Sequence, residues 1–489
     1  MTPPVAPTMT GSGFTSRLRR DLGTLESYAA LLGILIGAGI FRVTSDAWLR
    51  TGPSVILAQV VFAPLVLATS MAYAVFLSTP LGTEPGGEYT HISRTFRGYE
   101  TAFLAVWLKI IAYIGALAYM ANAFADYAIE GSRGLLHAES HRLPLALGTL
   151  VFFFLVHAVG VRWFGRLQVA MCAILGASLL VLIVPGLFAV RSENYRPFFT
   201  HGLAGFATCM PSVFFAFAGF EALAQTAGEV KESTRRLPGI FFPGILATTA
   251  IYVLMSAVTF GVLPGSRLAA STAPMAEVAA VYLPAGAALF VTLGALMALA
   301  SSLSASMLVP SRIGIMLAAD RLAPSWIGVV HPRTGTPIRG LLLTLAASGL
   351  LLASGQLSLA LNIAVFGMVI LYFLHSLTLL LLPWRNPALF GLVRVRLSLR
   401  WQRAAALLSL AAMGGLIVVQ VVQDLGTVRH SSLGERLRSQ SMTGLELAVV
   451  WGTIGVVIYL LGRWRGAREG HVYAAALALP EAGREASPW

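Results

Sequence analysis

The sequence predicts an all-α polytopic membrane protein with about twelve transmembrane helices. Of its 489 residues, 57% are hydrophobic and only 11% are charged, a balance that is not typical of soluble globular proteins. About twenty consecutive apolar residues cross a bilayer as a helix, and roughly twelve stretches reach that length. The net charge of +13 does not indicate nucleic-acid binding, because the basic residues lie singly or in short clusters between the apolar stretches.

The apolar stretches divide the chain into a long core and a short C-terminal pair. The fourth is the shortest, and several of the longer ones must tilt or bend within the bilayer. We expect 21–383 to form a ten-helix transport core, 403–464 to form helices 11 and 12, and 1–20 and 465–489 to be polar tails, the first of them disordered. The expected spans are 22–46, 53–78, 99–130, 144–160, 165–190, 205–228, 238–263, 284–316, 338–355, 358–383, 403–424 and 444–464.

The basic residues indicate the orientation of these spans. If the N-terminus is cytoplasmic, about two thirds of the 34 Lys and Arg residues lie in cytoplasmic segments or at the span ends beside them, as the positive-inside rule requires. An even number of spans then places both termini in the cytoplasm. The composition, rich in Ala and with Arg favoured over Lys, suggests a bacterial source and therefore the cell (inner) membrane.

Glycines interrupt two of the apolar stretches. Gly37-Ala38-Gly39 lies in the middle of the first, and Gly219 lies in the sixth, two residues before Glu221. A carboxylate within a span is costly in lipid, so Glu221 should face a cavity or a partner. Two broken helices, placed alike in the two halves of a membrane protein, indicate a transporter binding site near the midplane. The alternative is that the glycines only allow close helix packing.

Four motifs follow one another in the chain, and together they resemble the amino acid–polyamine–organocation transporter superfamily. They are GILIGAGIF in the first span, PGGEY after the second, FFAFAGFEALAQTAGEVKESTRRLP in the sixth and the loop after it, and SRIGIMLAADRLAPSWIGVVHPRTGTP in the eighth and the loop after it. The resemblance covers spans one to nine. It implies two inverted five-helix repeats, at about 21–190 and 205–383, with broken helices 1 and 6 holding the substrate, followed by two extra helices.

A broken helix exposes backbone groups that can bind an amino acid. The N–H groups that follow Gly39, near Ile40 and Phe41, suit a carboxylate, and the carbonyls near 215–218 suit an ammonium group. By resemblance, Phe215 is an outer gate, although ordinary packing is the alternative. The residues predicted to bind substrate are Ile36, Gly37, Ala38, Gly39, Ile40, Lys109, Tyr113, Phe215, Ala216, Ala218, Gly219 and Glu221.

The third span carries the main departure from the family pattern. Lys109, Ala112 and Tyr113 share one helix face, and cation-selective relatives have a glutamate at the position of Ala112. We therefore expect a neutral or zwitterionic amino acid, with a polyamine or cationic amino acid permease as the alternative. Lys109 is expected to meet an anionic group of the substrate, pair with Glu221 or carry a proton. Glu221 either holds the helix break together or takes up a proton during transport.

The coupling ion stays open. The fifth span has no lysine of the kind that replaces sodium in some proton-coupled relatives. Ser301 and Ser302 in the eighth span, together with carbonyls of the first, offer the oxygen ligands that a sodium ion prefers, although small residues at a helix interface are the simpler interpretation. Sodium coupling, proton coupling and uncoupled exchange are all compatible with the sequence.

Other classes of membrane protein fit less well. An enzyme needs a nucleophile–base pair or metal ligands, and the nine histidines form no pair at ligand spacing within one span. A non-transporting amino-acid sensor would carry a soluble output domain, for which the polar tail after Trp464 is too short. No cofactor is expected, and the expected partners are an amino acid, membrane lipid and a coupling proton or sodium ion.

Overall fold

The computed structural model describes residues 18–37, 39, 44–132, 135, 137–271, 274–438 and 442–468. This part of the chain is helical, and its only β-type contact is an isolated parallel bridge between Leu22 and Val230. The α-helices are α2 Thr24–Leu35, α3 Thr44–Thr51, α4 Val55–Leu77, α5 Glu88–Phe96, α6 Glu100–Gly131, α7 Ala138–Val159, α8 Val161–Ala189, α9 Gly202–Phe217, α10 Ala222–Gln225, α11 Ser233–Arg236, α12 Phe241–Val262, α13 Gly265–Ala270, α14 Pro274–Tyr282, α15 Ala285–Ala319, α16 Ile338–Ala353, α17 Leu357–Arg385, α18 Pro387–Phe390, α19 Leu399–His430, α20 Leu433–Arg438 and α21 Gly444–Arg468.

Short 3₁₀ helices occur at several of the connections. They are η2 Gly52–Ser54, η3 Pro80–Thr83, η4 Ser192–Tyr195, η5 Ala227–Glu229, η6 Leu237–Gly239 and η7 Ser325–Ile327.

The number of membrane spans agrees with the sequence. Within the described residues, 10 helical segments are long and apolar enough to cross a membrane, and two shorter apolar helices, Thr24–Leu35 and Ile338–Ala353, fall where the first and ninth spans were expected. The protein is therefore a multi-pass membrane protein with an all-α fold, as predicted.

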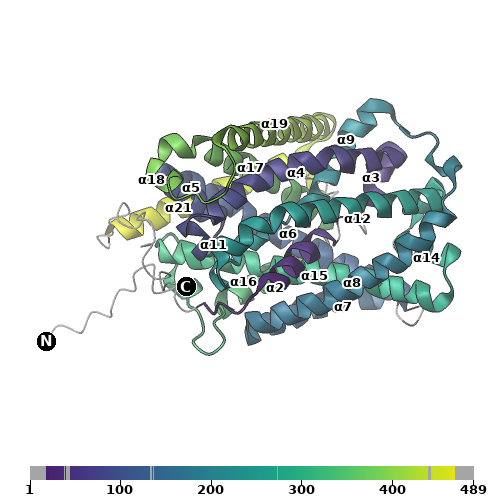
Figure 1. The fold of residues 1–489 in the computed structure, drawn as a ribbon, viewed down its shortest axis with the longest axis horizontal. Helices are drawn as coiled ribbons and strands as arrows, with labels where there is room; N and C mark the ends of the chain where they lie inside the picture. The colour runs from purple at the N-terminus through teal and green to yellow at the C-terminus, as the bar shows by residue number, and fades with distance from the viewer. Residues whose placement is uncertain are drawn as a thin grey trace.

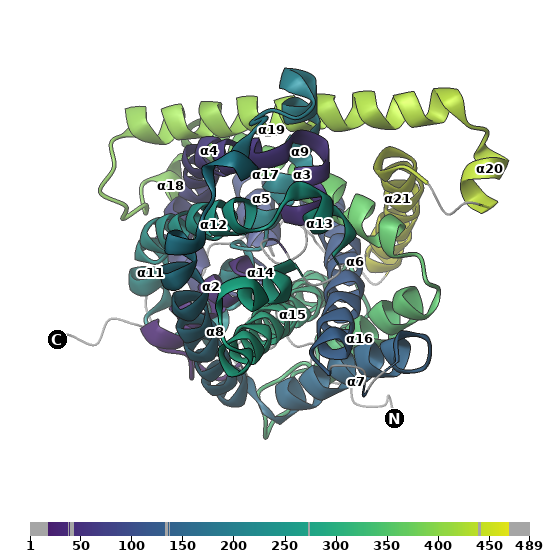
Figure 2. The same cartoon turned by 90° about the vertical axis from the view of Figure 1, so that its right-hand side faces the viewer.

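The long helices run roughly along one axis of the molecule (Figure 1). The short helices α5, α11 and α18 lie at one end, together with the end of α21, and α3 and α14 lie at the opposite end. Viewed from the α14 end, α2 and α15 lie near the middle of the bundle, with α7, α8, α12, α19 and α21 around them (Figure 2).

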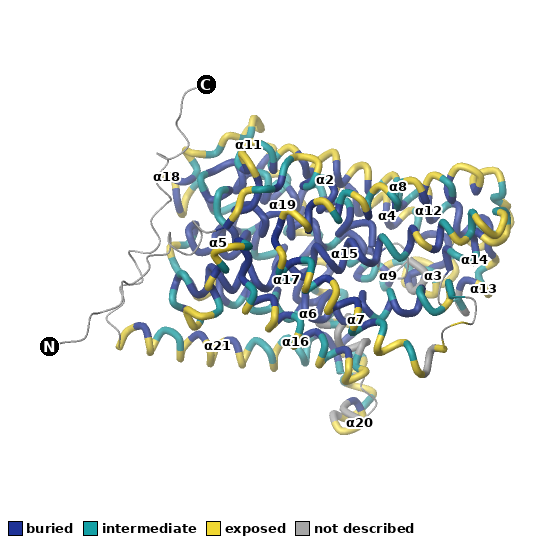
Figure 3. The backbone as a smooth tube through the Cα atoms, turned by 90° about the horizontal axis from the view of Figure 1, so that it is seen from below, coloured by how far each residue is buried: buried dark blue, intermediate teal, exposed yellow. Residues whose placement is uncertain are grey.

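Burial follows this arrangement. Helix α15 is buried on every side from Ala298 to Ala318, and its many Ala and Ser residues let the neighbouring helices α2, α6 and α8 approach closely. The last two long helices, α19 and α21, are the least buried of the spans, and Figure 3 shows the exposed stripe of α21. Leucine and valine dominate their exposed positions, as lipid-facing surfaces require.

Paired tryptophans attach α21 to the core. The rings of Trp107 on α6 and Trp451 on α21 stack with their centroids 4.6 Å apart. Each indole N–H donates to the backbone carbonyl of the other tryptophan, at 2.9 Å in both directions. These two contacts satisfy both indole donors.

Candidate functional site

The first and sixth spans are both interrupted at their predicted glycines. Helix α2 ends at Leu35, and Ile36 leaves the helical conformation with φ −83° and ψ 68°. Helix α9 ends at Phe217, and α10 begins only at Ala222. Between them Gly219 has φ +114°, a conformation that glycine adopts freely and other residues do not. The predicted breaks are confirmed.

The two breaks lie against each other. A Cβ atom on Gly39 would lie 2.5 Å from the Cα of Ala216, so the two backbones touch and only glycine fits. The hydroxyl of Tyr252 on α12 lies within hydrogen-bonding distance of the carbonyls of Leu35 and Ala216, 2.6 Å from the latter, and its one proton is shared between them. One buried side chain thus joins the ends of both helices.

Glu221 holds the break of the sixth span together. Its carboxylate accepts hydrogen bonds from the hydroxyls of Tyr113 on α6 and Tyr372 on α17. The backbone N–H of Gly219 also donates to it, at 2.9 Å. An ionised carboxylate is an acceptor only, so three donors on one fully buried carboxylate suit its charged form.

Lys109 pairs with Glu88 rather than with Glu221. Its Nζ lies 2.9 and 2.8 Å from the two carboxylate oxygens of Glu88, and both side chains are fully buried. Glu88 also accepts from the hydroxyl of Tyr73 at 2.6 Å and from the amide of Gln225 at 2.9 Å. The suggested pairing of Lys109 with Glu221 is therefore wrong, because the PGGEY loop supplies a closer carboxylate.

Glu88 reaches Lys109 because α5 folds back into the bundle. Every residue of α5 from Glu88 to Thr95 is buried. His91 Nδ1 lies 2.9 Å from Nε2 of His375 on α17 and its ring stacks on Phe76. Burial lowers the pKa of His91 to about 3, so this imidazole is neutral at physiological pH and acts as a packing and hydrogen-bonding group.

A narrow cavity of about 50 Å³, the central cavity, lies at the two breaks. It is smaller than the roughly 300–1,000 Å³ of most small-molecule sites, so its walls must move apart before they can enclose an amino acid. Five side chains from α6 and α17 form an apolar wall: Ala112, Ala116, Met120, Ala364 and Met368. Of the predicted residues, those that line the cavity are Gly39, Tyr113, Phe215, Ala216, Ala218 and Gly219.

The other residues predicted to bind substrate do not line this cavity, whereas Ser302, a predicted sodium ligand, does. Glu221 lies behind its two tyrosines, and Lys109 is held by Glu88. Ile36 is buried at the end of α2, and Gly37 packs against Ser302. Ala38 and Ile40 lie outside the described residues.

Sequence reasoning missed several residues that support the cavity, above all Tyr372, Tyr252, Glu88 and Gln225. The available signal was weak. An intramembrane Lys or Glu requires a partner, but sequence does not show which tyrosine or loop carboxylate folds onto it.

Ser301 and Ser302 are directed at the end of α2. Ser302 Oγ lies 2.8 Å from the carbonyl oxygens of both Gly33 and Ile34, and its one proton can be donated to either of them. Ser301 Oγ lies 3.1 Å from the Gly33 carbonyl and 2.9 Å from that of Ala298. These carbonyl and hydroxyl oxygens are of the kind that sodium binds, and here the two hydroxyl protons are donated among the three carbonyls. No group of three or more His, Cys, Asp or Glu side chains suited to a metal occurs within the described part of the chain.

The end of the bundle that carries α5 and α11 is closed by strong contacts. Leu22 exchanges backbone hydrogen bonds with Glu229 and Lys231, at 3.0 and 2.9 Å. Arg312 forms a buried ion pair with Glu229 at 2.7 Å, and Arg94 forms one with Asp320 at 2.8 Å. We call these contacts the inner latch, after the cytoplasmic orientation that the sequence predicts for this end.

An all-helical membrane bundle with two broken helices around a central cavity defines a membrane transporter rather than an enzyme. The family model for amino acid permeases matches residues 22–435, most of the chain, and the protein belongs to this family.

Curated relatives include several transporters. A branched-chain amino acid permease of Bacillus subtilis is 28% identical over 341 residues, covering 65% of this chain and 71% of its own. A methylthioribose transporter of the same bacterium is 26% identical over 360 residues, with 70% and 77% covered. The human Asc-type amino acid transporter 1 is 25% identical over 411 residues, with 80% and 76% covered.

Proposed function

We propose that the protein carries neutral amino acids across the bacterial cell membrane by alternating access, with both termini in the cytoplasm. The observation that carries this proposal is the composition of the cavity wall. Its lining side chains are apolar apart from two serines and a tyrosine, and at the third-span position where cation-selective relatives carry a glutamate the cavity is lined by Ala112. A wall without a free carboxylate favours an uncharged substrate side chain.

In the proposed binding mode, backbone groups of the protein bind the α-carboxylate and ammonium groups of the substrate. The α-carboxylate accepts hydrogen bonds from the N–H groups that follow Gly39. The ammonium group donates to the second lone pairs of the carbonyl oxygens at the ends of α2 and α9. The substrate side chain lies against Ala112, Ala116 and Met368. The name of the Bacillus relative, a branched-chain amino acid permease, agrees with an apolar side chain at this wall.

Glu221 is proposed to act in the transport cycle through the sixth-span break rather than by direct contact with substrate. Its three hydrogen bonds join α6, α9 and α17, so a movement of the broken helix must change them. Taking up a proton would remove the charge that these donors satisfy.

The test is uptake by proteoliposomes that contain the purified protein. Labelled leucine, alanine and serine are compared with arginine, putrescine and methylthioribose, and sodium and pH gradients are imposed separately. We expect a neutral amino acid to be accumulated and to be the best competitor. Stronger competition by arginine or putrescine than by every neutral amino acid would show that the substrate class is wrong.

A further inference from the structure

A second, strongly polar cavity lies at the end of the bundle opposite the inner latch. Its volume is about 640 Å³, and it is formed where the end of α3, the first turns of α9 and α17 and the last turns of α19 meet. Its charged and amide-bearing lining residues include Arg50, Asn362, Gln420, Gln423, Asp424 and His430. We call it the outer cavity.

The outer cavity and the central cavity share two helices and lie in series along them. On α9, Pro211 and Ser212 line the outer cavity and Phe215, one turn further on, lines the central one. On α17, Asn362 lines the outer cavity and Met368, less than two turns on, lines the central one. A solute that enters from this end therefore meets the outer cavity first.

Asp424 gives this cavity its chemical character. Only 6% of the residue is exposed. Oδ1 accepts from the amide of Gln420 at 2.9 Å, and Oδ2 accepts from the backbone N–H of Leu445 at 2.8 Å. Within the described residues no Lys, Arg or His forms an ion pair with it. A carboxylate buried in a membrane protein without a cation marks a ligand or ion pathway.

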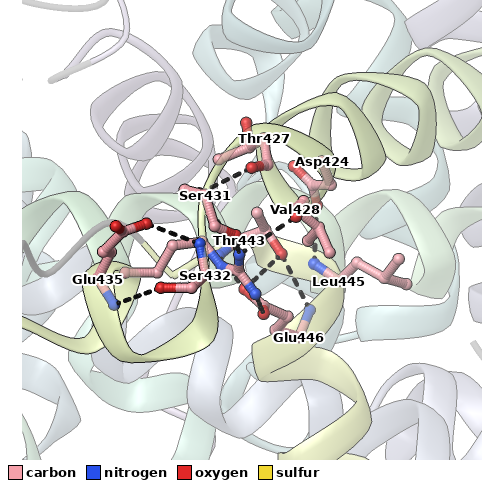
Figure 4. A network of polar contacts seen from close by, with 10 residues as sticks. Asp424, Thr427, Val428, Ser431, Ser432, Glu435, Thr443, Leu445 and Glu446 are labelled. Carbon is pink, nitrogen blue, oxygen red and sulfur yellow. Dashed lines mark hydrogen bonds and ion pairs between the residues drawn. The ribbon is translucent and has the colours of Figure 1, made fainter.

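Arg436, the cation of the adjoining turn, already has other partners. Arg436 pairs with Glu446 at 2.6 Å and also donates to the carbonyl of Ser431. Figure 4 shows this network between the end of α19 and the start of α21, with Asp424 bound to Leu445 beside it. The turn is therefore stabilised without neutralising Asp424.

We propose that the outer cavity is a second binding site for the amino acid, occupied on the way to the central cavity. Asp424 binds the ammonium group, and Arg50, which lines the same cavity, binds the carboxylate. A polar cavity with one buried negative group concentrates such a solute and raises its rate of capture. This inference rests on the proposed function for the identity of the amino acid. The effect of Asp424 on the charge preference of the cavity can be tested whether or not the proposed function is correct.

The experiment uses the full-length protein with Thr427→Cys as a reporter and the native cysteines, Cys172 and Cys209, changed to Ser. Thr427 lines the outer cavity and is exposed. The labelling rates of a cationic and an anionic methanethiosulfonate reagent are compared, with and without leucine. The same rates are measured after adding Asp424→Asn, which keeps an oxygen for the Leu445 N–H and removes the charge.

We expect Asp424→Asn to lower the ratio of cationic to anionic labelling rates by about tenfold, the effect of losing one charge-assisted hydrogen bond. The variant should also lose the protection of the reporter cysteine by leucine. The KM for leucine uptake should rise while kcat stays unchanged. Glu435→Gln, at the same turn and outside the cavity, should change none of these. Glu221→Gln, which alters the central site, should leave the protection of the reporter cysteine by leucine intact.

An unchanged rate ratio, or an Asp424→Asn variant with wild-type KM and leucine protection, would overturn the proposal and leave Asp424 as a structural cap of α21. Failure of the proposed function gives a different result. In that case the wild-type protein takes up no neutral amino acid, while the reagent ratio still reports whether Asp424 gives the outer cavity a cation preference.

Discussion

At the residue scale, Glu221 is the side chain that links the helix break to the rest of the core. Glu221→Gln keeps the size of the side chain but replaces one acceptor with an NH₂ group facing a hydroxyl or N–H donor. We expect the variant to insert into the membrane and to transport at least about tenfold more slowly, since one charged hydrogen bond is worth about 1.5–3 kcal/mol. Tyr372→Phe, which removes one donor, should give a smaller loss. Wild-type rate and pH profile in Glu221→Gln would assign the carboxylate a purely structural role.

The buried pair of Lys109 and Glu88 leads to a prediction about the stability of the protein. Lys109→Met leaves a fully buried carboxylate with only Tyr73 and Gln225 as donors, and breaking a buried ion pair in this way costs about 3–5 kcal/mol. The apparent melting temperature in detergent should fall clearly. Adding Glu88→Gln should recover much of the loss, because no buried charge then remains unpaired. A Lys109→Met protein as stable as the wild type would contradict the pairing.

The same residues show how far sequence reasoning reaches at this scale. Lys109 and Glu221 could be identified as the important intramembrane charges, because ionisable residues in apolar spans are rare and costly. Their partners could not be identified. Glu88 follows a turn that reads as a cytoplasmic loop, and only the folding of α5 into the bundle brings it to Lys109.

At the scale of the elements, the breaks in α2 and α9 were predictable because glycine is the residue that an interrupted helix needs. The cavity between them was only partly predictable. Its backbone side follows from the breaks, but the apolar wall depends on the register between α6 and α17, which no pattern within either helix determines. Ala364 and Met368 look like ordinary lipid-facing or core residues until α17 is placed beside α6.

Gly219→Ala tests the break itself. The native φ of +114° is strained for alanine, and the added Cβ would lie 3.0 Å from Cγ1 of Ile34. We expect a cost of roughly 1–3 kcal/mol for the strained backbone and a large loss of uptake. Gly176→Ala on α8 is the matched control, since nothing lies within 4 Å of its added Cβ. If uptake by Gly219→Ala equals that of the control, the unwound segment is not needed for transport.

At the scale of the whole molecule, the number of spans and the all-α fold followed from apolar segment length, since a bilayer sets that length physically. The attachment of α21 did not, because Trp107 and Trp451 carry no pattern that pairs them. Which end of the bundle is closed and which is open also could not be predicted from the sequence. The end with the inner latch is closed by two buried ion pairs and by the backbone pairing of Leu22, while the opposite end holds the outer cavity.

In the proposed alternating-access cycle, the inner latch opens when the outer cavity closes. Replacing Glu229 and Arg312 together by Gln removes both charges of one latch pair and leaves neither unpaired. We expect the double variant to favour the conformation that is open at the latch end. A cysteine introduced in place of Ala227, which is fully buried beside the latch, should then react faster with a thiol reagent. The increase should be roughly tenfold if the ion pair stabilises the closed end by about 1.4 kcal/mol.

A second cysteine distinguishes this shift from general loosening. Ser212→Cys, on the wall of the outer cavity, should become less reactive in the same double variant, because a population that opens at one end must close at the other. The native cysteines are changed to Ser in both reporters. Faster labelling at both positions would mean that the ion pair only stabilises the fold, and unchanged labelling at both would mean that the latch does not control the equilibrium between the two open conformations.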